Sequence, residues 1–128
     1  MTRDLTLLIE RVRSGSGADE RLDAEIMCAI AAPDGSFVEQ SRFNFAWCIY
    51  EKPGRLWNKR DWHRPDGWPL TSSLDAVVAL VEKKLPGKAV AILEEAVTKC
   101  ALPSLTLEKF PREYLARFLT ALQAQEAA

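Results

Sequence analysis

The chain has 128 residues, of which 48% are hydrophobic and 27% charged, and its formal net charge is −1. This length and composition predict one globular domain over residues 1–128 and exclude a wholly disordered chain. Affinity for nucleic acid rests mainly on neutralised phosphates, so the charge argues against a dedicated nucleic-acid-binding protein. No apolar run approaches the ~18 residues needed to cross a bilayer, so we expect no membrane association.

Two helices separated by a short turn are predicted at the N-terminus. Apolar residues recur at helical spacing over residues 4–13, and the sequence SGSG at residues 14–17 interrupts this pattern. A cap at Ser16 or just after it would start the second helix and place Asp19 and Glu20 in its first turn, where the helix dipole favours acidic side chains. The buried stripe of the second helix is expected to comprise Leu22, Ile26 and Ile30.

Strands are predicted in the next part of the chain. The sequence PDG at residues 33–35 ends the second helix, and Phe37 and Val38 are expected to open a strand. The clearest strand spans residues 43–50, because large apolar side chains alternate there with smaller or more polar ones. One face, which helices must cover, carries Phe43, Phe45, Trp47 and Ile49. The opposite face, smaller and more mixed, carries Asn44, Ala46, Cys48 and Tyr50.

A well-marked helix follows the irregular segment 51–70. Ser72, with Asp75 three residues later, resembles a capping box, and Pro86-Gly87 closes the helix. Its apolar stripe is expected to comprise Leu74, Val77, Val78, Val81 and Leu85.

The C-terminal part of the chain is less clearly marked. Residues 88–100 fit either a helix or the start of a strand, and the sequence leaves both open. Residues 104–108 alternate like a short strand, and Pro111 suits the first turn of a final helix. The core face of that helix is expected to comprise Leu115, Phe118, Leu119 and Leu122, with fraying after Gln123. The pattern as a whole predicts an α+β fold, in which a small, mostly antiparallel sheet is sandwiched between helix layers.

No catalytic or metal-binding constellation is visible in the sequence. The chain has one histidine, His63, and no nucleophile motif, so enzymatic activity is disfavoured although left open. The cysteines Cys28, Cys48 and Cys100 are widely spaced and form no CxxC pair, so we expect buried free thiols in the cytoplasm and no metal site. Because no glycine-rich phosphate cradle is present either, we expect no cofactor.

The segment 52–68 is the one candidate binding site. It interleaves cationic and aromatic side chains, a combination that recurs in protein interfaces and in proteins that stack on nucleobases. The alternative is that its tryptophans fold back over the aromatic strand and carry arginines above their rings. The candidate residues are Arg55, Trp57, Lys59, Arg60, Trp62, His63, Arg64 and Trp68.

Three stretches of the chain resemble a known family. AWCIYEKPGRLWN at residues 46–58 and WPLTSSLDAVVALVEKKLPG at residues 68–87 are similar to the phage ABA sandwich domain family, as is RLDAEIMCAI at residues 21–30. These are small proteins encoded in phages and prophages of Gram-negative bacteria. The resemblance implies a sheet between helix layers, and it implies no activity or catalytic residues.

These observations together predict a non-enzymatic accessory protein of a phage or prophage. We expect it to bind a host or phage macromolecule, a protein in the first instance, and to act in regulation or against a host defence. The alternative is a nucleic-acid or nucleotide-binding protein that uses the segment 52–68. The sequence does not indicate the oligomeric state.

Overall fold

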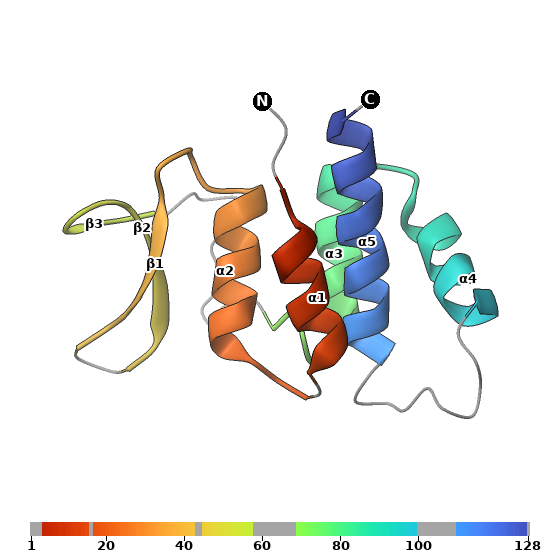
Figure 1. The fold of residues 1–128 in the computed structure, drawn as a ribbon, viewed down its shortest axis with the longest axis horizontal. Helices are drawn as coiled ribbons and strands as arrows, with labels where there is room; N and C mark the ends of the chain where they lie inside the picture. The colour runs from red at the N-terminus through yellow and green to blue at the C-terminus, as the bar shows by residue number, and fades with distance from the viewer. Residues whose placement is uncertain (1–3, 16, 43–44, 58–68, 100–109, 128) are drawn as a thin grey trace. The chain divides into compact units, whose positions relative to one another are not determined.

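The computed structural model describes residues 4–15, 17–42, 45–57, 69–99 and 110–127. Helices and strands together confirm the α+β class. In chain order they are α1 (Thr6–Ser14), α2 (Glu20–Ile30), β1 (Phe37–Gln40), β2 (Trp47–Lys52), β3 (Arg55–Leu56), α3 (Leu74–Lys84), α4 (Ala89–Lys99) and α5 (Phe110–Ala127), as Figure 1 shows. The chain divides into two compact units, one of residues 1–18 and 70–128 and the other of residues 19–69. The single domain predicted from chain length stays a prediction.

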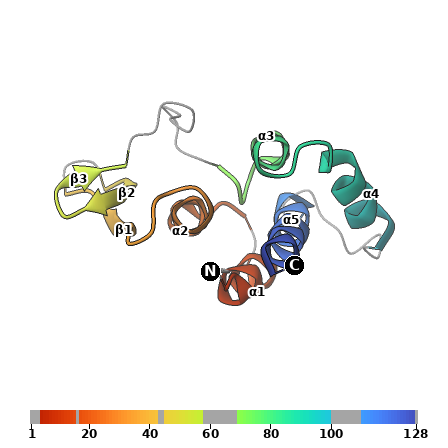
Figure 2. The ribbon, with the colours of Figure 1, turned by 90° about the horizontal axis from the view of Figure 1, so that it is seen from above.

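Helix α5 is the centre of the first unit. It packs against α1, α3 and α4, and Figure 2 shows α1 and α3 on different sides of it. Its predicted core face is confirmed, since Leu115, Phe118, Leu119 and Leu122 are all buried. The helix continues to Ala127, beyond Gln123, and the predicted fraying of this end stays a prediction.

A buried arginine joins α5 to the end of α1. Arg112 is only 4% exposed, and its Nε donates a hydrogen bond to the carbonyl oxygen of Gly17 at 3.0 Å. Its Nη1 donates to the carbonyl oxygens of Arg11 and Val12 at 3.3 and 3.2 Å. The last carbonyls of a helix have no partners within the helix and carry partial negative charge, so this guanidinium compensates the C-terminus of α1.

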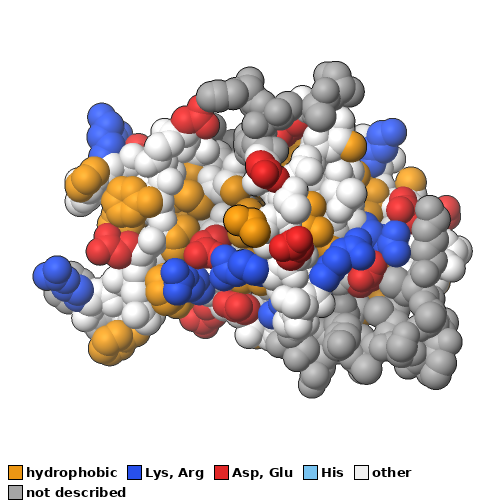
Figure 3. All heavy atoms as spheres, in the orientation of Figure 1, with side chains coloured by type: hydrophobic (Ala, Val, Ile, Leu, Met, Phe, Trp, Pro, Cys, Tyr) orange, Lys and Arg blue, Asp and Glu red, His pale blue; other side chains and the backbone are white. Residues whose placement is uncertain are grey.

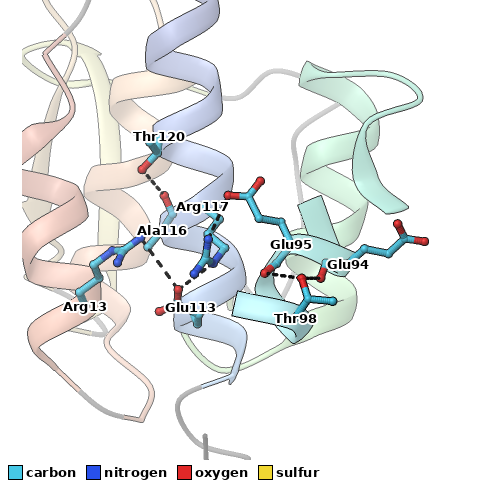
Figure 4. Close-up of polar contacts among 8 residues, drawn as sticks. All are labelled: Arg13, Glu94, Glu95, Thr98, Glu113, Ala116, Arg117 and Thr120. Carbon is cyan, nitrogen blue, oxygen red and sulfur yellow. Dashed lines mark hydrogen bonds and ion pairs between the residues drawn. The ribbon is translucent and has the colours of Figure 1, made fainter. Parts of the chain in front are cut away.

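Partly exposed ion pairs connect three helices of the same unit (Figure 4). Arg117 of α5 lies between Glu95 of α4 and Glu113 of its own helix, at 3.0 and 2.8 Å. Arg13 of α1 approaches the same Glu113 carboxylate at 3.9 Å. Each of these charged groups has a partner of opposite sign, and the arrangement is one of helix packing.

Residues 89–99, which the sequence predicted as either helix or strand, form helix α4. Its buried residues, Ala89, Ile92 and Ala96, recur at helical spacing, and Ala89 accepts a hydrogen bond of 2.8 Å from the hydroxyl of Tyr114 in α5. Packing on α5 therefore settles a pattern that was ambiguous in the sequence. The expected strand at residues 104–108 lies outside the described residues.

The second unit consists of α2 and an antiparallel sheet with strand order β1-β2-β3. Helix α2 packs against β1 and β2, and its predicted stripe of Leu22, Ile26 and Ile30 is buried. Of the two helix layers that the sequence predicts around the sheet, the described part of this unit contains one, formed by α2.

Two helix starts differ by a few residues from those predicted. Asp19 precedes α2 as its N-cap, and its carboxylate accepts a 3.0 Å hydrogen bond from the backbone N–H of Leu22, whereas the sequence placed it in the first turn. Ser73, not Ser72, caps α3, and its hydroxyl oxygen accepts from the backbone N–H of Ala76. Both caps satisfy backbone donors that the helix itself leaves unpaired.

The central strand begins later than predicted. Residues 43 and 44 lie outside the described residues, and Phe45 has φ of 60°, a left-handed conformation that interrupts an extended strand. The backbone N–H of Ser41 donates to the carbonyl of Ala46 at 2.7 Å, so these residues connect β1 to β2. Phe45 is 70% exposed, and its predicted place on the covered aromatic face is wrong.

None of the described helices combines the length and the apolar character needed to cross a membrane.

Candidate binding surface

A hairpin forms where the sequence suggested an irregular loop. Strand β2 runs to Lys52, the chain turns through Pro53 and Gly54, and β3 pairs back, with Lys52 opposite Arg55 and Tyr50 opposite Leu56. Gly54 has φ of 79°, which glycine adopts without steric cost. Turns with proline followed by glycine favour this geometry. Irregular structure throughout 51–70 is therefore a wrong prediction for residues 51–56.

Helix α2 covers one face of the sheet. Ile49 of β2 is buried on this face, and the guanidinium of Arg21 in α2 lies 5.0 Å from the ring centroid of Trp47. The prediction that helices cover the face carrying Trp47 and Ile49 is thus confirmed for these two residues.

The opposite face carries a row of apolar side chains, which we call the open face. Phe37 of β1 pairs with Tyr50 of β2, which pairs with Leu56 of β3, so the three side chains project from the same side of the sheet. The rings of Phe37 and Tyr50 stack, with centroids 5.5 Å apart and planes 17° apart. Both aromatic residues are half-buried, and Leu56 is 55% exposed.

No other described element of this unit lies over the open face in Figures 1 and 2. Figure 3 shows hydrophobic side chains at the surface over the strands, with basic and acidic side chains beside them. An exposed apolar row of this kind, bordered by charge, is typical of an interaction site.

Two charged residues of the strands, Glu39 and Lys52, make no ion pair in the described part of the chain. Glu39 lies opposite Cys48 in the register, at one end of the row. Lys52 lies at the hairpin end, next to an irregularity in the pairing. Both side chains are exposed. Arg55, by contrast, pairs with Glu51 at 3.4 Å between Nε and Oε2.

The structure places two of the eight predicted site residues. Arg55 is exposed on β3. Trp57 is only 6% exposed, and its backbone N–H donates to the carbonyl of Ile49 at 2.8 Å, which extends the hairpin. Trp57 is therefore buried, in agreement with the alternative prediction that the tryptophans of this segment fold back onto the protein. The other six, Lys59, Arg60, Trp62, His63, Arg64 and Trp68, lie outside the described residues, and their role stays a prediction.

The cysteines that the structure describes are free. Cys28 and Cys48 are half-buried, and burial, with a smaller contribution from the charge of Glu25, raises the pKa of the Cys28 thiol. A raised pKa keeps the thiol protonated and unreactive. In the described ranges no three histidine, cysteine, aspartate or glutamate side chains gather in a way that could hold a metal ion.

Sequence reasoning missed Phe37, Tyr50 and Leu56 as a surface. The available signal was the Pro53-Gly54 pair between two short runs of β-forming residues, which predicts a hairpin and aligns Tyr50 with Leu56.

No family model matches the chain, and comparisons with characterised proteins and with solved structures give no match. The resemblance to the phage ABA sandwich domain family stays a prediction.

Proposed function

We propose that this chain is a non-enzymatic binding protein, which associates with a protein partner through the open face of its sheet. The observation that carries the proposal is the row Phe37–Tyr50–Leu56, which is apolar, partly exposed and opposite the face that α2 covers. Aromatic residues on a preformed, rigid element are well suited to a protein interface, because little conformational entropy is lost when they bind.

A protein partner fits the open face better than a nucleobase does. Stacking on bases requires free ring faces, but Phe37 and Tyr50 each give one of their two faces to the other, which leaves at most one outer face per ring. Leu56 flanks Tyr50 on the other side. Glu39 adds a negative charge beside the row, which would repel phosphate.

The setting we propose for this binding is that of a phage or prophage accessory protein, acting on a host or phage macromolecule in the cytoplasm. The sequence resemblance of residues 46–58 and 68–87 supports this setting. The predicted site residues that follow Arg55 in the chain would extend the surface beyond the hairpin.

A comparison of two leucine variants tests the proposal. Leu56→Asp introduces a charge on the open face, whereas Leu7→Asp makes the same change on α1, where Leu7 is 74% exposed. The immobilised full-length chain is incubated with lysate of a Gram-negative bacterium, and separately with the chain itself, with and without nuclease. We expect nuclease-resistant capture that Leu56→Asp abolishes and Leu7→Asp leaves intact. Capture that nuclease or salt removes would favour nucleic-acid binding instead, and capture indifferent to Leu56→Asp would contradict the proposed surface.

A further inference from the structure

Phe45, in the connection between β1 and β2, combines an unfavourable backbone conformation with an exposed aromatic side chain. Among the described residues it is the only one besides glycines with a positive φ, which is 60°. A bulky residue rarely adopts this left-handed conformation, because its Cβ crowds the backbone. Packing gives no compensation, since the side chain is 70% exposed. The stability of the fold therefore does not explain a phenylalanine at this position.

Two hydrogen bonds hold Phe45 in this conformation. Its backbone N–H donates to the carbonyl oxygen of Ser41 at 3.0 Å, and its own carbonyl oxygen accepts from Nε2 of Gln40 at 2.9 Å. Both backbone polar groups of Phe45 are thus bound to the neighbouring strand end. An unfavourable backbone conformation persists only where its surroundings determine it, and such residues cluster at functional sites.

The same connection carries an exposed cation. Arg42, three residues before Phe45, is exposed and makes no ion pair in the described ranges. Aromatic and arginine side chains dominate the binding energy of protein interfaces. A guanidinium binds a carboxylate through paired hydrogen bonds, so Arg42 is suited to an acidic group beside the ring.

We propose that Phe45 is an anchor residue, whose ring enters an apolar pocket of a partner protein while Arg42 binds a carboxylate at the rim of that pocket. This inference goes beyond the proposed function, because it concerns a different surface of the same unit. Phe45 precedes β2, whereas Leu56 of the open face follows the turn at the other end of that strand. A ring that is already held outward loses little conformational freedom when it binds.

A protein pocket fits this feature better than a lipid surface does. Burial of one phenylalanine side chain contributes about 10- to 100-fold to an affinity. That is too little to hold a chain on a bilayer, where stable attachment takes two anchoring signals. The net charge of −1 adds no attraction to anionic lipids. In a protein pocket, by contrast, the surrounding contacts exclude water and add to the contribution of the ring.

Photo-crosslinking from position 45 tests the proposal. Phe45→benzoylphenylalanine keeps an aromatic side chain at the site, and Leu7→benzoylphenylalanine is the matched control on α1, where Leu7 is 74% exposed. Each full-length variant is irradiated in lysate of a Gram-negative bacterium, and mass spectrometry identifies the crosslinked peptide. We expect position 45 alone to form an adduct, at an apolar pocket of one protein with an aspartate or glutamate beside it. Excess wild-type chain should suppress this adduct, and excess Phe45→Asn should not.

Calorimetric titration of the identified protein then measures both side chains. Phe45→Asn should weaken binding by more than about tenfold and Arg42→Glu by about three- to tenfold, whereas Leu7→Asn should leave it unchanged. Asparagine tolerates the left-handed conformation, so Phe45→Asn should melt at the wild-type temperature or a few degrees above it. A fall of more than about 4 °C would assign the ring a structural role and overturn the proposal.

The crosslinking has other outcomes that would overturn the proposal. They are no adduct, an adduct with lipid, nucleic acid or a second copy of the chain, an adduct outside an apolar pocket, or an adduct that Phe45→Asn suppresses as well as the wild type does. The proposed function fails separately. Binding that Leu56→Asp abolishes and Phe45→Asn leaves intact would remove only the anchor, and the reverse would remove only the open face.

Discussion

The two units differ in how they use the polar and apolar groups at their surfaces. In the unit of residues 1–18 and 70–128, Arg112 donates to three carbonyl oxygens, and the carboxylate of Glu113 is shared by Arg13 and Arg117. In the unit of residues 19–69, the apolar row Phe37–Tyr50–Leu56 is partly exposed, and the exposed strand residues Glu39 and Lys52 make no ion pair in the described part of the chain. Polar groups that all have hydrogen-bond or ion-pair partners indicate a role in stability. An exposed apolar row with charged residues nearby indicates a surface for association.

The largest effect in this comparison is expected at Arg112. Arg112→Met removes the donors to three carbonyl oxygens while keeping most of the side-chain volume, and we expect it to lower the free energy of unfolding by about 2–4 kcal/mol. Arg13→Met, at a partly exposed ion pair, should cost about 0.5 kcal/mol or less. Urea denaturation followed by circular dichroism measures both. If both variants lowered the free energy of unfolding by the same amount, the proposed stabilising role of the buried Arg112 guanidinium would be contradicted.

The next effect concerns the space around that guanidinium. A Cβ at Gly15 would lie 2.5 Å from Nη1 of Arg112, so Gly15→Ala should cost about 1–3 kcal/mol by displacing the guanidinium from its acceptors. Gly17→Ala meets no atom within 4 Å and should cost about 1 kcal/mol, because its φ of 72° is unfavourable for alanine. In an Arg112→Met background the cost of Gly15→Ala should fall while that of Gly17→Ala should not. A cost of Gly15→Ala unchanged in that background would contradict the steric explanation.

Tyr114 provides a pH-dependent test of the helical unit. Tyr114→Phe removes the buried hydrogen bond to Ala89 and should cost about 1–2 kcal/mol at neutral pH. Burial, and to a lesser extent the charge of Glu82, raises the pKa of Tyr114 above its ordinary value of 10.0. The folded state therefore favours the protonated phenol, and its stabilisation is complete below pH 10 and is lost as the pH rises through the raised pKa. In urea titrations above pH 10, the advantage of the wild type over Tyr114→Phe should shrink, and an advantage that grew with pH would contradict this assignment.

A smaller effect tests the start of α3. Ser73→Ala removes the side-chain acceptor for the backbone N–H of Ala76 and should cost about 1 kcal/mol. Ser72→Ala changes the exposed neighbouring residue, which the sequence predicted as the cap, and should cost less than about 0.5 kcal/mol. Thermal unfolding of the two variants distinguishes them, and the reverse order would restore the sequence-based assignment.

The helices were more predictable than the binding surface, for a physical reason. The core face of α5, from Leu115 to Leu122, is visible because each apolar residue recurs with the helical period and all are buried. The exact cap was less visible, because Ser72 and Ser73 are chemically equivalent and only the backbone geometry distinguishes them. Of the ambiguous stretch 88–100, residues 89–99 needed the packing of α4 on α5 to settle their structure.

The open face depends on register, which alternation within one segment does not determine. The sequence correctly placed Tyr50 on the other face of the sheet from Trp47 and Ile49. Its neighbours on that face, Phe37 and Leu56, belong to two other strands and are known only from the strand pairing. The left-handed conformation of Phe45 also makes the strand shorter than expected. The sequence did not predict this, because a pattern of polar and apolar residues does not determine the φ angle of a single residue.

A series of backbone amide NMR spectra, recorded as the captured partner is added, tests the central claim most directly, because it reports on both units at once. If the open face is the surface for association, shifts on adding the partner should concentrate in residues 37–40 and 48–56 and be small in α1, α3 and α5. Shifts centred on those three helices, or no Leu56-dependent capture of a partner, would contradict the account.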